Sequence, residues 1–150
     1  MKLEILNGIL YAIAEYLPNL KLNGRSNRAR QRLLKKVVEK FQELQSDAQE
    51  LKIEHPDNLE KQNEEFVELY KEKAILDMTE NKHLLPSLYE ALLDYPYEIS
   101  VERINDKPSD ASVHDYIIDV LEEAINDDEK SMDTEDPAEE NQTIKNGDDE

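Results

Sequence analysis

One long amphipathic pattern constrains the fold of this chain more than any other feature of its sequence. Apolar residues recur at helical spacing between about Ser26 and Glu54, and at roughly 100° per residue they fall in a single arc. The residues of this arc are Leu33, Leu34, Val37, Val38, Phe41, Leu44, Ala48 and Leu51. The pattern predicts a long helix with one buried face and one face in water.

The water-facing side of this predicted helix gathers cations. Six of them lie in an arc nearly opposite the apolar one: Arg25, Arg28, Arg32, Lys35, Lys36 and Lys40. Arg30 breaks the pattern and projects toward the apolar flank. Residues 1–40 hold nine Lys/Arg against three Asp/Glu, whereas residues 41–150 hold nine against thirty-three. The chain is therefore an electrostatic dipole with a net charge of −18, and the six cations are the candidate partner-binding residues.

A second amphipathic helix follows after a short interruption. The stretch 55–58, His-Pro-Asp-Asn, disfavours helix before its proline, and Asp57 with Glu60 three positions on predicts a capping box. Because the connection is short, the two helices should form an antiparallel hairpin. Flanking helices are predicted from Leu3 to Leu17, from Thr79 to Leu92 with Pro86 as a kink or late start, and from Ser109 or Asp110 to Ile125.

Three short segments are predicted strands, near 20–22, 74–77 and 97–101. The fold class is therefore mainly α with a minor β component, an antiparallel helix hairpin with flanking amphipathic helices and at most a two- or three-stranded sheet. The predicted core contains Leu6, Ile9, Leu10, Ile13, Leu34, Val37, Val38, Phe41, Leu44, Phe66, Leu88, Ile117, Val120 and Leu121.

The sequence predicts one helical domain over residues 1–126 and a disordered acidic tail over 127–150. The tail holds eleven acids against Lys130 and Lys145 and lacks apolar periodicity, so it has little surface to bury. The chain has no cysteine, no apolar stretch of ~20 residues and no signal-peptide pattern at its start. We therefore expect a cytoplasmic protein without a membrane partner.

Three stretches resemble a bacteriophage family. They are Leu20-Lys21-Leu22-Asn23-Gly24 with Ser26 and Arg28, then Asn63-Glu64-Glu65-Phe66 with Leu69 and Ile75, and finally Tyr97-Glu98-Ile99-Ser100 with Asp110 and Tyr116. The chain resembles domain of unknown function family 1617, found in phages and prophages of Gram-positive bacteria, over most of residues 1–125. The resemblance implies a small phage-encoded protein of the host cytoplasm, and it carries over no catalytic or binding residue.

No constellation of residues predicts catalysis. The glycines Gly8, Gly24 and Gly147 are too scattered for a phosphate-binding loop. The histidines His55, His83 and His114 stand far apart, without a metal-site spacing, and His114 near a helix start is predicted to lie at the surface. Tyr89, Tyr95, Tyr97 and Tyr116 are predicted to be half-buried core residues rather than a binding groove. We expect no enzyme, no cofactor and no metal site.

Two roles remain open for the six cations. They can bind a partner, either a host or phage protein or, as the less favoured alternative, a nucleic acid. They can also serve as internal counter-charges to Glu64, Glu65, Glu68 and Glu72 of the neighbouring helix. The acidic surplus allows a further alternative, a mimic of DNA that occupies a host DNA-binding or defence protein. The predicted function is a non-enzymatic protein–protein interaction module, and the sequence leaves the oligomeric state open.

Overall fold

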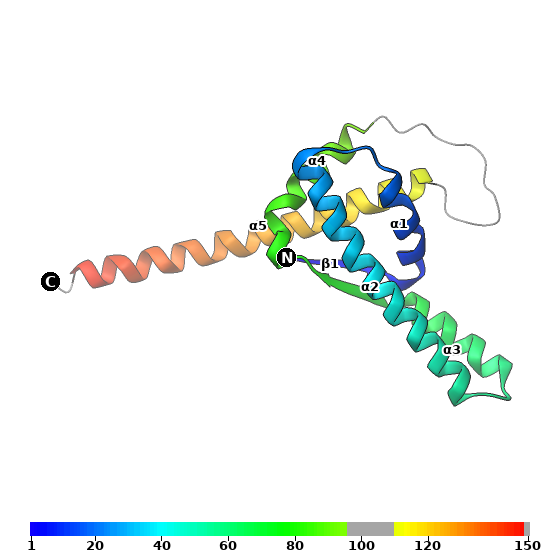
Figure 1. The fold of residues 1–150 in the computed structure, drawn as a ribbon. Helices are drawn as coiled ribbons and strands as arrows, with labels where there is room; N and C mark the ends of the chain where they lie inside the picture. Colours follow the sequence, from blue (N-terminus) through cyan, green and yellow to red (C-terminus); the bar gives the residue numbers. More distant parts are fainter. Residues whose placement is uncertain (96–109, 149–150) are drawn as a thin grey trace.

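A computed structural model describes residues 1–95 and 110–148 of this chain, and it is mainly helical with a small two-stranded antiparallel sheet (Figure 1). The predicted fold class is confirmed. The helices are α1 (Leu10–Tyr16), α2 (Gly24–Glu54), α3 (Leu59–Lys71), α4 (Leu85–Leu93) and α5 (Asp110–Asp148). Short 3-10 turns are η1 (Asn7–Ile9), η2 (Leu17–Asn19) and η3 (Thr79–Leu84), and the strands are β1 (Lys2–Leu6) and β2 (Lys73–Asp77).

The first residues form a strand, so the prediction of a helix from Leu3 was wrong for its first turns. Strand β1 pairs antiparallel with β2, with Leu3 opposite Leu76 and Ile5 opposite Ala74. All four of these side chains are buried, while Glu4 and Ile75 face outward. The leucines of this segment also fit helical spacing. Pairing with β2 and the alternation of buried and exposed side chains select a strand over a helix.

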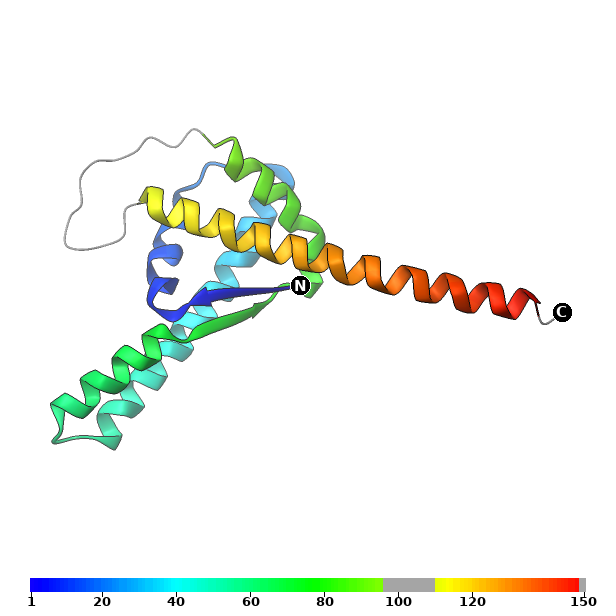
Figure 2. The same cartoon turned by 180° about the vertical axis from the view of Figure 1, so that it is seen from behind.

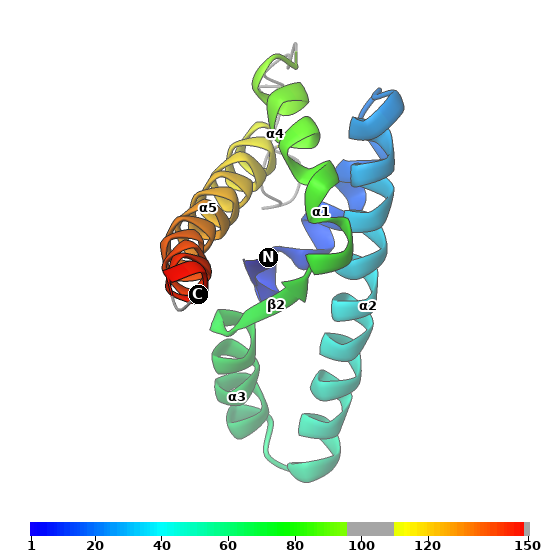
Figure 3. The same ribbon diagram turned by 90° about the vertical axis from the view of Figure 1, so that its left-hand side faces the viewer.

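The long helix and the hairpin are confirmed. Helix α2 spans 31 residues, and its N-terminal turn begins at Gly24, whose φ of 59° lies in the left-handed region that favours glycine. Helix α3 folds back along the C-terminal half of α2 (Figure 3). The capping-box prediction was wrong by one residue, because the Asn58 side chain, not Asp57, accepts the N–H of Lys61.

The other predicted strands have different outcomes. The strand near 74–77 is confirmed as β2, whereas 97–101 lies outside the described residues. Residues 20–22 form no strand, and side chains engage their backbone instead. The N–H of Lys21 donates to the Tyr95 hydroxyl at 3.0 Å, and the carbonyl of Leu20 accepts from Arg30 at 3.1 Å. These side-chain bonds take the place of a strand ladder.

The core lies where α1, α2, α4 and α5 meet one face of the sheet, with α5 packed on α4, α1 and β1 (Figure 2). Pro86 stands in the first turn of α4, as expected for a helix that starts late. Of the predicted core, seven residues are buried: Leu10, Ile13, Val37, Leu44, Leu88, Ile117 and Leu121. Leu6, Ile9, Leu34, Phe41, Phe66 and Val120 are partly buried, and Val38 is wrong because it is 37% exposed.

Helix α5 continues past the predicted domain boundary at 126 and projects away from the body (Figure 1). Its buried residues are Val113, His114, Ile117, Leu121 and Ala124, all before that boundary in the part whose burial is described. Pro137 lies within the projecting part, where a proline removes a helical hydrogen bond. Disorder of residues 127–150 stays a prediction.

Truncation after Asn126 is expected to leave the melting temperature within about 4 °C of the full chain. Beyond Asn126, a surface ion pair joins Asp128 to Lys82 of η3 at 3.9 Å. Such pairs contribute about 0–1 kcal/mol to the free energy of unfolding. A thermal melt followed by circular dichroism measures the difference. A drop of 10 °C or more would mean that the acidic segment docks on the folded body.

Candidate partner-binding face

The packing of α2 separates the six candidate cations from the core. Helix α2 buries Ala29, Leu33, Val37 and Leu44 against the body. Arg25, Arg28, Arg32 and Lys35 lie on the opposite side and are exposed, whereas Lys36 and Lys40 flank the packed face and are half-buried. The structure therefore keeps all six on one helix, and four of them form an exposed basic stripe.

The basic stripe of Arg25, Arg28, Arg32 and Lys35 has no ion pair among the described residues. Of the six candidates, Lys40 pairs with Glu43 at 3.3 Å, one turn along the same helix. Helix α3 lies beside the far half of α2, where Glu65 contacts His55 instead. Within the described part of the chain, the glutamates of α3 are thus not counter-charges to the stripe.

The position of Arg25, the first residue of the stripe, is electrostatically unfavourable for the helix itself. The first turn of α2 contains Arg25 and no acidic residue, although the N-terminal end of a helix carries partial positive charge. Cations there weaken a helix slightly, whereas they stabilise its C-terminal end. From Glu39 onward the same outward side becomes acidic, with Glu43, Asp47 and Glu50. The helix dipole therefore does not account for a cation at position 25.

Arg30 has a structural role, in agreement with its predicted projection toward the apolar flank. Its guanidinium donates to the carbonyl oxygens of Leu17, Pro18 and Leu20 at 3.1–3.4 Å, and also to the Asn27 side chain. These carbonyls end the α1–η2 segment, where positive charge is favourable. Arg30 is thus set apart from the stripe.

An exposed apolar patch adjoins the stripe, and sequence reasoning missed it. Tyr11 of α1 and Val38 of α2 are 48% and 37% exposed, and the Tyr11 ring lies 5.4 Å from the ring of Phe41. At helical spacing, Val38 falls between the packed arc of α2 and Lys35. A hydrogen bond to the Glu15 carboxylate raises the pKa of Tyr11 above its ordinary value. The sequence places Val38 and Phe41 on the apolar face, but only the packing of α1 on α2 brings Tyr11 beside Phe41, which lies three residues from Val38.

One histidine, His114, differs from the prediction. His114 is buried, at 7% exposure, and a hydrogen bond joins its Nδ1 to the Tyr16 hydroxyl. Its predicted surface position was wrong because α5 turns this side of the helix toward α1.

The tyrosine prediction is confirmed for Tyr89, Tyr95 and Tyr116, which are partly buried against the core, and Tyr97 lies outside the described residues.

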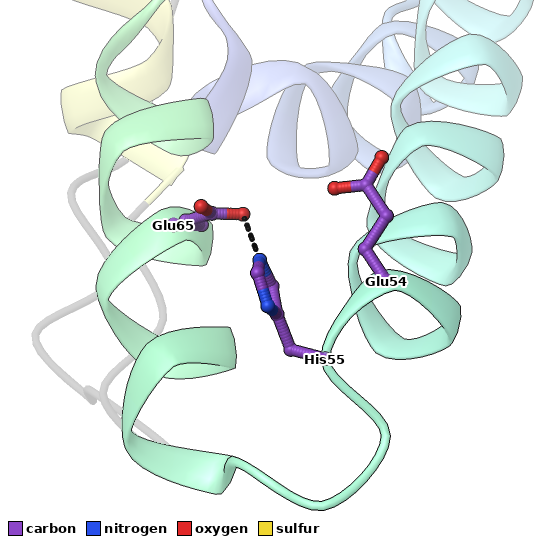
Figure 4. A group of neighbouring side chains, drawn as sticks. All are labelled: Glu54, His55 and Glu65. Atoms are coloured by element: carbon purple, nitrogen blue, oxygen red, sulfur yellow. Dashed lines mark hydrogen bonds and ion pairs between the residues drawn. The ribbon is translucent and has the colours of Figure 1, made fainter.

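Three potential metal ligands meet at the tip of the hairpin (Figure 4). Glu54 and His55 come from the end of α2, and Glu65 comes from the second turn of α3. One ligand atom from each lies within 4.8 Å of the others, and Nε2 of His55 lies 3.1 Å from a carboxylate oxygen of Glu65. Spacing along the sequence could not reveal this group, because its members join across a turn.

Comparisons with protein-family models, with curated proteins and with solved structures found no match. The resemblance to the phage family stays a prediction. Among the described residues, no helix combines the length and the apolar character needed to cross a bilayer.

Proposed function

We propose that this chain is a non-enzymatic interaction module that binds an acidic surface of another protein through the outer side of α2. The resemblance to phage proteins suggests that the chain is phage-encoded and acts in the cytoplasm of the infected cell, on a host or phage protein. The observation that carries the proposal is the stripe of Arg25, Arg28, Arg32 and Lys35, exposed and unpaired within the described residues, beside the apolar patch of Tyr11, Val38 and Phe41.

The combination of apolar and cationic side chains favours a protein as the partner. Protein interfaces are enriched in aromatic residues and arginine, with an apolar centre and a polar rim. Tyr11 and Val38 can supply such a centre, while the arginines supply hydrogen bonds to carboxylates. Complementary charge would also speed the encounter with an acidic partner.

Binding of nucleic acid through the stripe is the second candidate function. Cations in a line along one helix can follow a phosphate backbone, which is the observation in favour. The net charge of −18 opposes it. Titration of the protein with duplex DNA at ~50 mM and ~200 mM salt separates nucleic-acid binding from protein binding, because binding to the phosphate backbone weakens steeply with salt. Absence of binding at the lower salt rejects a direct binder and leaves mimicry of DNA by the acidic faces as the nucleic-acid-directed alternative.

Reversal of three stripe charges, Arg28→Glu, Arg32→Glu and Lys35→Glu, is expected to abolish partner binding and to leave the fold intact. All three side chains are exposed, and they make no ion pair among the described residues, so their reversal should remove no packing of the core. Repulsion should weaken binding by at least about a hundredfold, since like charges across an interface cost several kcal/mol. A pull-down from infected-cell lysate, followed by titration of the recovered protein, measures the loss.

A matched control places the same charge change on the hairpin. Lys52, Lys61 and Lys71 are exposed residues of α2 and α3 outside the stripe, and their reversal to glutamate alters the net charge equally. This control should retain the partner. If both triple variants lose the partner equally, net charge and not the stripe governs binding, and the proposal is rejected.

A further inference from the structure

We propose that Glu54, His55 and Glu65 form a binding site for a divalent transition-metal cation of the zinc type at the tip of the α2–α3 hairpin. The site is independent of the partner-binding function. It contradicts the expectation from sequence spacing, which considered ligands on one helix face and not ligands joined across the turn.

The geometry already approaches that of a metal site. In a tetrahedral zinc centre, bonds of about 2.0–2.1 Å place the ligand atoms about 3.3 Å from one another. His55 Nε2 and the Glu65 oxygen are 3.1 Å apart, close to that spacing. Figure 4 shows the Glu54 side chain extending toward the same space from the last turn of α2. Its carboxylate lies within 4.8 Å of the other two ligand atoms, so a modest side-chain rotation completes the set.

The surroundings hold the central ligand in place. The N–H of His55 donates to the carbonyl of Leu51, and the carbonyl of His55 accepts from the Gln62 side chain at 2.6 Å and from the Asn58 N–H at 3.3 Å. The His55 backbone is thus tied to both arms of the hairpin. Glu54 makes no described hydrogen bond or ion pair, which leaves its carboxylate available. An anchored imidazole between two carboxylates is a partly preorganised site.

The ligand types select the class of ion. An imidazole nitrogen with two carboxylates suits zinc and its neighbours in the transition series, and three protein ligands leave a fourth position for water or a partner's side chain. Calcium requires six to eight oxygen ligands, and magnesium prefers an octahedral oxygen shell. The three ligands here, one of them a nitrogen, do not supply either oxygen shell. The site should therefore bind zinc more tightly than calcium or magnesium.

Metal binding would reinforce a weakly packed part of the molecule. Helix α3 contains no buried residue, and Leu59 and Val67 are 69% and 50% exposed. A cation shared by Glu54, His55 and Glu65 would join the end of α2 to α3. Because an ion that binds only the folded state stabilises it, zinc should raise the melting temperature of the hairpin or of the whole chain.

The test is calorimetric titration of the full-length, metal-free protein with Zn²⁺, compared with the His55→Gln and Glu65→Gln variants. We expect one site in the wild-type chain, weakened at least about tenfold by either substitution, the smallest loss usual for changes around metal ligands. His83→Gln is the matched control, since His83 is exposed on η3 and lies outside the group. Mg²⁺ at the same concentration should produce no comparable binding.

Two further readouts distinguish the site from loose binding by the acidic segment 127–150, which all variants retain. Co²⁺ should give the intense visible absorption of a four-coordinate ion in wild type and not in His55→Gln, and Zn²⁺ should shift the side-chain ¹⁵N resonances of His55. Melting temperatures in chelator must be equal for all variants, so that weaker binding does not reflect unfolding. Zn²⁺ binding that is absent, or unchanged in His55→Gln, overturns the proposal.

Discussion

Ile5→Ala is expected to lower the free energy of unfolding by about 2–5 kcal/mol, among the largest effects of any single truncation in this chain. The Ile5 side chain is completely buried in β1, opposite Ala74 of β2. Its removal leaves a cavity between the sheet and the helices that cover it, in addition to the lost transfer free energy. Urea unfolding followed by circular dichroism measures the change.

A neighbouring substitution separates strand from helix. Leu6 is only partly buried in the strand, so Leu6→Ala should cost less than Ile5→Ala. The core predicted from the sequence, with a helix from Leu3 to Leu17, includes Leu6 but not Ile5, and it would give the reverse order. A larger loss for Leu6→Ala would therefore contradict β1 and its pairing with β2.

The elements predicted well from sequence are those whose periodicity admits a single interpretation. Helix α2 carries an apolar arc from Leu33 to Leu51 and has no glycine or proline after Gly24, and α3 follows a proline-containing connection. The late start of α4 follows from Pro86. In these segments the local preference and the tertiary packing agree, which is why the hairpin and the fold class could be predicted.

The errors occur where a partner distant in the sequence decides the structure. Residues 2–6 fit both a helical and an alternating pattern, and pairing with residues 73–77 selects the strand. Residues 20–22 alternate like a strand, but Tyr95 and Arg30 engage their backbone groups. Contacts of this range are not encoded in local periodicity.

The candidate site also contains features that the sequence predicts and features that depend on contacts distant in the sequence. The exposed stripe of Arg25, Arg28, Arg32 and Lys35 could be predicted, because it depends on the angular spacing of a single helix. The contact of Tyr11 with Phe41 and the approach of His55 to Glu65 could not, because each requires knowing which side of one helix faces another. Sequence therefore identified the cations but neither the apolar patch nor the potential metal ligands.

His114→Ala is expected to lower the free energy of unfolding by about 2–4 kcal/mol, because it opens a cavity and removes a buried hydrogen bond. The His114 ring lies between the rings of Tyr16 and Tyr95, with centroids 6.0 and 6.2 Å away, and it links α5 to α1 through the Tyr16 hydroxyl. His83→Ala, at an exposed position, should change stability by no more than about 0.5 kcal/mol. Chemical denaturation of both variants at pH 7.5 gives the comparison. Small and equal losses in both variants would support the surface position predicted for His114 from the sequence. They would contradict the packing of α5 against α1.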